Sequence, residues 1–261
     1  MVGVGSLSPA FEQRRNVISA TGDRTVSEID IKVLSTTAMK AVFEELAPQF
    51  ERASGHRLNV SLGPSSQLEA RLAGGEAADV AILTTTAAAD MIARGKVVAG
   101  SLVDVARSSL GVAVQRGAPK PDISSADAFK RALLAAKSVA LSKPVGGGLS
   151  GAHMARVFEQ LGIAEAMQPK AIYGAGGPGG LAGLAVLRGE AEIGVQQIAE
   201  LMAVPGIDFV GPVPAPLQTV TPFTACILTS ASHAEAGRAL IDFLTTPAAK
   251  SVIRASGLEA A

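Results

Sequence analysis

The order of strand-like and helix-like segments constrains the fold of this chain more than any other feature. From residue 29 on, short β-branched runs alternate with amphipathic stretches, and the pattern begins βαβαβα. Two longer strand-like runs, residues 109–117 and 219–230, enclose a central block that is itself βαβα. Such alternation predicts mostly parallel sheets flanked by helices. A block that is entered and left through long strands predicts two α/β lobes joined by two crossing segments.

We divide the chain into three parts on this basis. Residues 1–28 show no sustained periodicity and are predicted to be a mobile N-terminal tail. Lobe one consists of residues 29–108 together with residues 222–261, and lobe two of residues 112–215. Each lobe has about one hundred residues or more, which is the size of an ordinary domain. A single doubly wound domain is the alternative interpretation.

Composition argues against several classes of function. The 261 residues include 23 basic and 23 acidic side chains without obvious blocks, and only 3% of residues are aromatic. Neither a basic face for phosphates nor an aromatic platform for bases is indicated, so we expect no nucleic-acid partner. No apolar run approaches the ~20 residues of a membrane span, so the chain is not expected to be membrane-embedded. The first 28 residues are too polar for a secretory signal, which predicts a cytoplasmic protein for the chain as written.

The residue pattern does not favour metal or cofactor chemistry. Cys226 is the only cysteine and lies in an apolar run, which predicts a buried thiol and excludes an internal disulfide. The three histidines are far apart in sequence, and no HxxxH, HExxH or CxxC spacing occurs. The stretch "GAGGPG" at 174–179 matches G-x-G-x-x-G, but no acidic residue follows about 20 residues later to hold a ribose. We therefore expect no metal and no cofactor.

Four predicted strand-to-helix turns are built from small residues. These turns lie at residues 35–37, 63–66, 146–151 and 174–180. Each precedes a helix N-terminus, where free backbone N–H groups and the helix dipole favour an anion. Turns of this kind lie at the carboxyl ends of parallel strands, where open α/β sheets bind ligands. The four turns together predict a shared cleft for a small anionic ligand, with ordinary helix caps and connectors as the alternative.

From about residue 29 to its end, the sequence resembles the extracellular solute-binding proteins of the molybdate-binding type. The likeness rests on "VLSTTAMKAVFEELAPQFERASG", "LGPSSQLEARLAGGEAADVAIL", "LSGAHMARVFEQLG" and "LRGEAEIGVQQIAEL". The resemblance implies a two-lobed, periplasmic-binding-protein-like fold of type II that closes over an anion held by neutral donors. It also implies a periplasmic location and an ABC permease as partner.

The resemblance also implies which residues contact the ligand. Combined with the turns, it gives the predicted ligand-binding residues Thr36, Thr37, Ser65, Ser66, Ser150, Gly151, Gly179 and Gln197. Two positions depart from the family pattern. The first-loop serine of the family falls near Ala38, and Gln197 replaces the tyrosine that follows "GEAEIG". These departures favour an organic di- or tricarboxylate over molybdate.

Other segments are more similar to the aconitate isomerase branch of the same family, namely "AGSLVDVARSSLGVAVQRGAPKPDIS" and "LLAAKSVALS". Such an enzyme moves a proton next to a carboxylate, which requires a positioned base and an anion clamp. His153 or Lys143 would be that base. We expect a solute-binding protein for a small anion. An isomerase of aconitate-like unsaturated tricarboxylates is the alternative, and a cytosolic ligand sensor is a second alternative.

Overall fold

The structure is a computed structural model and describes residues 28–145, 149–174 and 181–261. The predicted tail lies outside the described residues except for residue 28, and Gly179 lies outside them as well. Within the described residues, no helix combines the length and the apolar character needed to cross a membrane.

The first part of the chain forms the predicted alternation of strands and helices. Its elements are β1 (Asp30–Thr36), the 3-10 helix η1 (Thr37–Met39), α1 (Lys40–Ser54), β2 (Arg57–Gly63), α2 (Ser65–Ala73), β3 (Val80–Thr84) and α3 (Thr85–Ala93). The helical spacing of apolar residues in α1 places Val42, Phe43, Leu46 and Phe50 in the core. Gly55 then ends α1 in the left-handed conformation, with φ of 73°.

The central block completes the second lobe. Its elements are α4 (Ala126–Ala135), β5 (Val139–Ser142), α5 (Leu149–Gln160), α6 (Ala164–Met167), β6 (Ala171–Gly174), α7 (Ala182–Leu187), β7 (Ile193–Gln197), α8 (Ile198–Met202), β8 (Ile207–Pro212) and η2 (Ala215–Leu217). The chain closes with α9 (Ala234–Leu244), α10 (Pro247–Ala255) and β10 (Glu259–Ala260). The proline-rich segment after residue 203 contains a strand, β8, at residues 207–212. β8 is an edge strand paired with β4, and its last residue is Pro212, a position where a missing N–H is tolerated.

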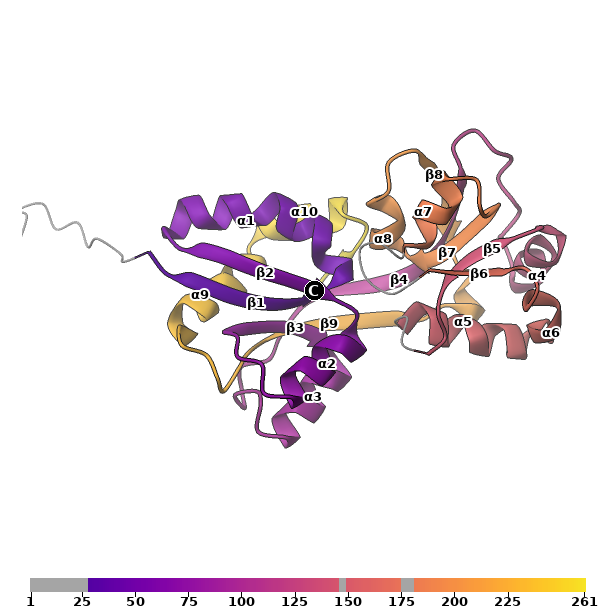
Figure 1. Cartoon of the computed structure of the whole chain (residues 1–261). Helices are drawn as coiled ribbons and strands as arrows, with labels where there is room; N and C mark the ends of the chain where they lie inside the picture. Colours follow the sequence, from indigo (N-terminus) through magenta and orange to yellow (C-terminus); the bar gives the residue numbers. More distant parts are fainter. Residues whose placement is uncertain (1–27, 146–148, 175–180) are drawn as a thin grey trace, which may run out of the picture.

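Two long strands join the lobes, as predicted. β4 (Val103–Gln115) and β9 (Val220–Ile227) pair antiparallel, with Ser108 opposite Thr221, and both run along the long axis of the molecule (Figure 1). β4 begins six residues before the predicted start because residues 103–109 pair with β9, a contact that local sequence does not reveal.

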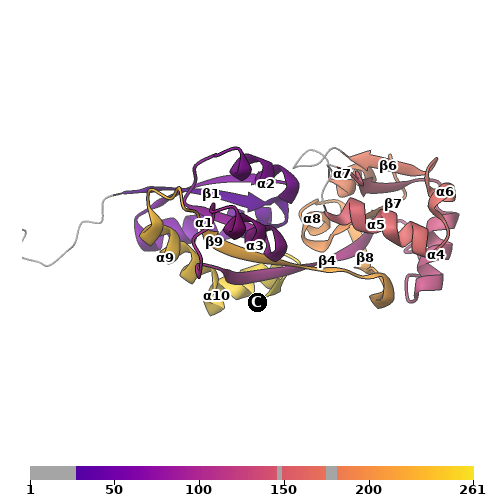
Figure 2. The ribbon, with the colours of Figure 1, turned by 90° about the horizontal axis from the view of Figure 1, so that it is seen from below.

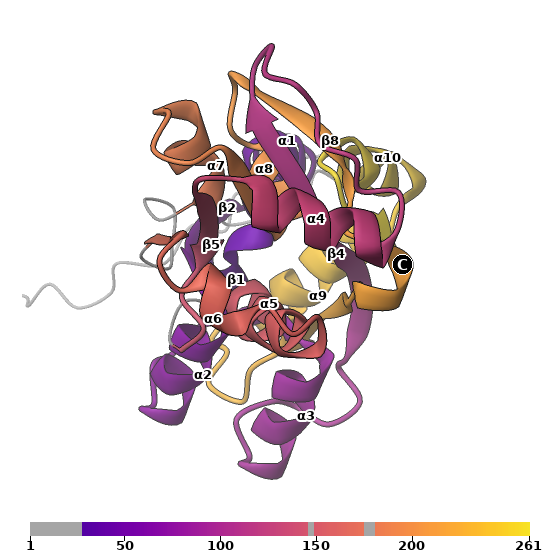
Figure 3. The same ribbon diagram turned by 90° about the vertical axis from the view of Figure 1, so that its right-hand side faces the viewer.

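The strands follow the order β2-β1-β3-β9-β4-β7-β5-β6, with β8 and β10 paired to β4. The strands β2, β1 and β3 are parallel in lobe one, as are β6, β5 and β7 in lobe two, whereas β4 and β9 run antiparallel to their neighbours. Helices α1, α9 and α10 cover one face of lobe one, and α2 and α3 cover the other (Figure 1). In lobe two, α4, α5 and α6 pack on one face and α7 on the opposite face (Figure 3).

Candidate functional site

The carboxyl ends of the parallel strands in both lobes point toward the junction between the lobes (Figures 1 and 2). η1 follows β1 in lobe one, α8 follows β7 in lobe two, and the two short helices are in contact. Ala199 of α8 is buried in the hydrophobic core of lobe one, which ties the lobes together at this point. The turns after β1 and β7 therefore meet at the place where α/β sheets bind ligands.

Three consecutive hydroxyl side chains are buried where β1 passes into η1, namely Ser35, Thr36 and Thr37. Thr37 is 6% exposed, and its Oγ1 has no hydrogen-bond partner among the described residues. An unpaired buried hydroxyl costs about 1–3 kcal/mol. Most buried polar groups are paired, so this hydroxyl is a candidate for pairing with a ligand.

The turn after β2 leads into α2 without a side-chain cap. Pro64 occupies the N-cap position and its side chain has no acceptor atom, so the first N–H groups of α2 have no capping side chain. Ser65 is buried and Ser66 is exposed at the same helix start. The nine-residue α2 therefore presents two hydroxyls and an uncapped N-terminus at the carboxyl end of β2.

In lobe two, the start of α5 packs closely on the end of β5. Ser150 is buried, and its Oγ donates a hydrogen bond of 3.1 Å to the Oγ of Ser142. Gly151 lies against the backbone of the turn, since a Cβ at this position would come 2.2 Å from the Lys143 carbonyl oxygen. A glycine is thus required for this approach.

Two glutamines end β7, and they have different environments. The Oε1 of Gln196 accepts a hydrogen bond of 2.7 Å from the Ala182 N–H, and its Nε2 donates to the Ser142 Oγ at 3.5 Å. Gln197 is 6% exposed, and no described residue pairs with its Oε1. Gln196 is thus a structural residue, whereas the amide oxygen of Gln197 is left without a partner among the described residues.

Glu200 lies in α8, one turn after Gln196. Burial raises the pKa of its carboxyl group to about 7, and a side-chain hydrogen bond with Gln196 opposes this increase. Among the described residues, no charged group contributes to this shift of the pKa. Because Gln196 also contacts Ser142, the Glu200 carboxyl is connected through side chains to Ser142 and from there to Ser150. Glu200 carries no signal in the sequence, because only packing produces its pKa.

The two predicted bases lie in different surroundings. His153 is half-buried, and its Nε2 lies 2.8 Å from the carbonyl oxygen of Leu217, so this nitrogen carries the proton and donates it. Lys143 is exposed. Lys40, the first residue of α1, forms an ion pair with Glu44 at 2.5 Å.

A further hydroxyl turn, after β3, was missed although the sequence "LTTTAAAD" carries the same signal as the others. The Thr84 hydroxyl accepts a hydrogen bond from the Ala87 N–H and caps α3. The Thr85 Oγ1 lies 2.7 Å from the Thr224 Oγ1, and Thr224 donates to Asp104. Because the single proton of Thr224 is used by Asp104, Thr85 is the donor in their pair.

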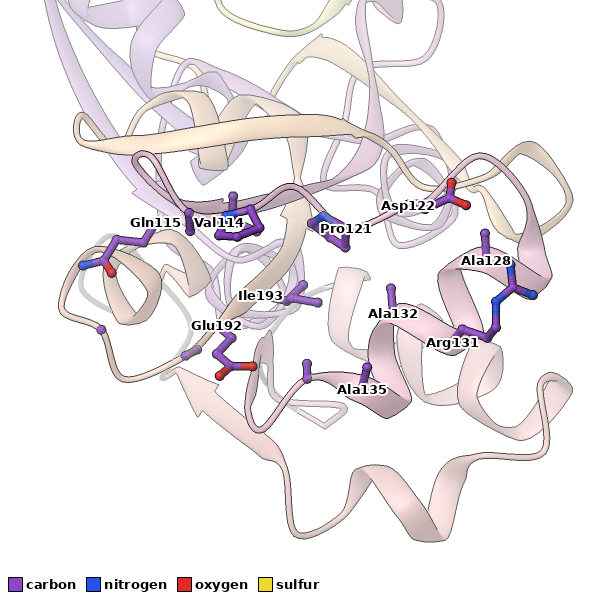
Figure 4. Close-up of a pocket in the computed structure, with 15 residues that line it drawn as sticks. Val114, Gln115, Pro121, Asp122, Ala128, Arg131, Ala132, Ala135, Glu192 and Ile193 are labelled. Carbon is purple, nitrogen blue, oxygen red and sulfur yellow. The ribbon is translucent and has the colours of Figure 1, made fainter.

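A cavity of about 630 Å³ lies in lobe two, away from the junction (Figure 4). It is bounded by α4, by Gln115 at the end of β4 and by Ile193 at the start of β7, which is the amino end of the parallel strands. Figure 4 shows Asp122 and Arg131 on one side and Glu192 on another. The predicted ligand-binding residues that the structure describes do not line this cavity. Among the described residues, no three His, Cys, Asp or Glu side chains form a group that could hold a metal.

Residues 31–259 match the family described as bacterial extracellular solute-binding protein. This chain belongs to that family. The solute-binding protein is 37% identical to an aconitate isomerase from Pseudomonas sp. over 235 residues, which cover 88% of this chain and 87% of the relative. It is 23% identical to the molybdate-binding protein ModA of Mycobacterium tuberculosis, over 98% of this chain and 92% of ModA. The periplasmic molybdate-binding protein of Azotobacter vinelandii has the same fold, with a TM-score of 0.72 at 21% identity. The match covers 87% of this chain and 98% of that protein.

Proposed function

We propose that this solute-binding protein binds a small organic anion, a di- or tricarboxylate rather than molybdate, at the junction between its lobes. The observation that carries the proposal is the pair of buried polar groups, one from each lobe, that the described residues leave unpaired. Thr37 opens η1, and Gln197 ends β7 directly before α8, the helix that contacts η1. A ligand carboxylate would accept a hydrogen bond from the Thr37 hydroxyl. It would also accept one from Gln197 when the amide is turned so that its NH₂ group takes the place of Oε1. The uncapped start of α2 would add backbone donors.

The chemistry of the predicted donors supports a carboxylate. They are hydroxyls, an amide and backbone N–H groups, which hold an anion without a counter-charge. Gln197 supplies a planar NH₂ group suited to a carboxylate oxygen. The relative with 37% identity is named for aconitate, whereas the molybdate binder of M. tuberculosis shares 23%.

The partner that follows from the family is an ABC permease, to which the closed, loaded protein would deliver its ligand. Closure would be a hinge motion of the two lobes about the crossing strands, near Gly111 and Thr221. Thr221 lies opposite Ser108 in the β4–β9 pair, so both hinge positions belong to strands shared by the lobes.

A thermal-shift panel tests the choice of ligand. The panel contains citrate, cis- and trans-aconitate, molybdate, tungstate, sulfate and phosphate. A ligand at ~100 times its dissociation constant adds about 2.7 kcal/mol to the free energy of unfolding, which raises the melting temperature by a few degrees. Stabilisation by the carboxylates alone supports the proposal. Stabilisation by a tetrahedral oxyanion alone contradicts it.

A second candidate function is the isomerisation of an aconitate-like tricarboxylate. The specific observation in its favour is Glu200, a carboxyl group with a pKa of about 7 near the junction, which can both accept and donate a proton at neutral pH. A proton would leave the methylene carbon beside a carboxylate, the double bond would shift, and a proton would return to the former alkene carbon. His153 and Lys143 are the other two candidate bases.

Proton NMR of cis-aconitate in heavy water tests this activity. Conversion of cis-aconitate to the trans isomer with uptake of deuterium supports the activity. If Glu200→Gln loses this conversion and Glu190→Gln keeps it, Glu200 is the base. Glu190 is a suitable control because it is exposed and paired with Arg188 at 3.7 Å. If the protein binds aconitate but the spectrum of cis-aconitate does not change, the isomerase function is contradicted and only the binding function stands.

A further inference from the structure

The part of the chain that the structure describes contains four buried side-chain atoms without a hydrogen-bond partner. These atoms are the Thr37 Oγ1, the His56 Nδ1, the Ser108 Oγ and the Gln197 Oε1. His56 directly precedes β2 at the amino end of the sheet, remote from the junction. Thr37 and Gln197 belong to the proposed site. Ser108 lies on the crossing strand β4, and neither the sequence nor the family resemblance pointed to it.

Strand register places Ser108 beside Gln197. Leu110 on β4 is the partner of Gln197 on β7, so their side chains share one face of the sheet. Ser108 precedes Leu110 by two residues on the same strand and therefore points to that same face. Diagonal neighbours of this kind lie roughly 7–8 Å apart. The Ser108 hydroxyl is thus within reach of a molecule that contacts Gln197.

The surroundings of Ser108 do not explain why a hydroxyl is placed there. Ser108 is 1% exposed. Its cross-strand partner is Thr221, and the next pair on the same face, Ala106 and Phe223, belongs to the hydrophobic core of lobe one. A serine at the edge of such a core, without a partner, loses the energy of its hydration and gains no bond. A ligand that reaches the Ser108 hydroxyl from the junction with a polar group would supply the missing hydrogen-bond partner.

We propose that Ser108 is a third ligand-binding residue, which donates a hydrogen bond to a second carboxylate of the bound di- or tricarboxylate. The inference rests on the proposed function, since it assumes a ligand between Thr37 and Gln197. One carboxylate contacts these two residues, and the second lies over the crossing strands at Ser108. An anion with a single carboxylate, or a tetrahedral oxyanion, is too short to make both contacts.

The experiment is isothermal titration of the full chain and of two serine variants, with trans-aconitate, citrate and acetate. Ser108→Ala removes the proposed donor. Ser109→Ala is the matched control, because Ser109 is the adjacent half-buried serine and points to the opposite face of β4. Loss of one hydrogen bond to a charged group lowers affinity by about tenfold. We expect this loss for Ser108→Ala with the tricarboxylates, and wild-type affinity for Ser109→Ala.

Thermal unfolding without ligand distinguishes binding from a structural role. Because the Ser108 hydroxyl is unpaired, its removal should leave the melting temperature unchanged or raise it, while the affinity falls. A lower melting temperature with unchanged affinity would show that Ser108 only stabilises the fold and would overturn the inference. If both variants bind a tricarboxylate as tightly as the wild type, the inference about Ser108 is overturned and the proposed function stands. Failure of the wild-type protein to bind any carboxylate overturns the proposed function and the inference together.

Discussion

A Cβ atom at Gly151 would lie 2.2 Å from the carbonyl oxygen of Lys143 and 2.5 Å from that of Ser142. The first turn of α5 thus rests directly on the backbone that follows β5. This contact fixes the α5 N-terminus, and with it Ser150, at the junction between the lobes.

Gly151→Ala should therefore destabilise the protein and weaken ligand binding. Backbone atoms cannot yield as side chains do, so the cost should reach or exceed the 1–3 kcal/mol typical of overpacking. Urea unfolding measures it. Gly211→Ala is the control, since a Cβ there would lie 3.4 Å from a flexible isoleucine atom. Equal stability of both variants would contradict the close packing of α5.

Ser66→Ala should lower the affinity for the carboxylate ligand by about tenfold, the effect of one hydrogen bond to a charged group. Because Ser66 is exposed, the free energy of unfolding should stay within about 0.5 kcal/mol of the wild type. Calorimetric titration and urea unfolding of the same sample give both quantities. Unchanged affinity would remove Ser66 from the site.

Gln197→Glu should abolish most anion binding at pH 8. The substitution keeps the shape of the side chain and adds a negative charge where the ligand carboxylate is proposed to lie. Repulsion of a few kcal/mol at about 4 Å corresponds to at least a hundredfold loss of affinity. Gln168→Glu, an exposed position in lobe two, introduces the same charge away from the junction and should bind normally. Equal titrations for the two variants would place Gln197 outside the site.

Glu200 should make the stability of the protein decrease as the pH rises. Its folded-state pKa of about 7 exceeds the ordinary value of 4.5, so between these values the folded protein retains a proton that the unfolded chain has released. The free energy of unfolding then falls between pH 4.5 and 7, by at most about 3 kcal/mol, and levels off above pH 7.

The Glu200→Gln variant cannot titrate at this position and should lose this part of the pH dependence. Urea unfolding at pH 5, 6, 7 and 8 compares the two proteins, and the variant should be the more stable one at pH 8. Parallel curves over this range would show that Glu200 titrates normally.

Cys226 should be unreactive in the folded protein. Its side chain is fully buried, and burial raises the pKa of the thiol to about 12, so almost no thiolate exists at neutral pH. A thiol reagent such as Ellman's reagent should label no cysteine under native conditions and one per chain in urea. Rapid labelling of the native protein would require local opening around β9.

Local patterns were sufficient for the elements whose signals are local. The apolar spacing within residues 37–53 is enough to indicate α1. β8 was missed because prolines surround it, and its pairing with β4 is a distant contact. The candidate site shows the same division. Small residues at turns led to Thr37 and Ser65, whereas Ser108 sits in the interior of a strand, where a serine carries no distinctive signal.

By itself, the sequence determined the class of the fold, since the alternation of strands and helices is a property of neighbouring residues. Its hydroxyl-rich turns, which are equally local, suggested the chemical character proposed for the site. Only the tertiary structure decided which polar groups lose water without gaining a partner. The register of β4 with β7 places Ser108 beside Gln197, and the packing around α8 raises the pKa of Glu200. Both depend on distant segments coming together, and hydrogen bonding and desolvation are set by that arrangement.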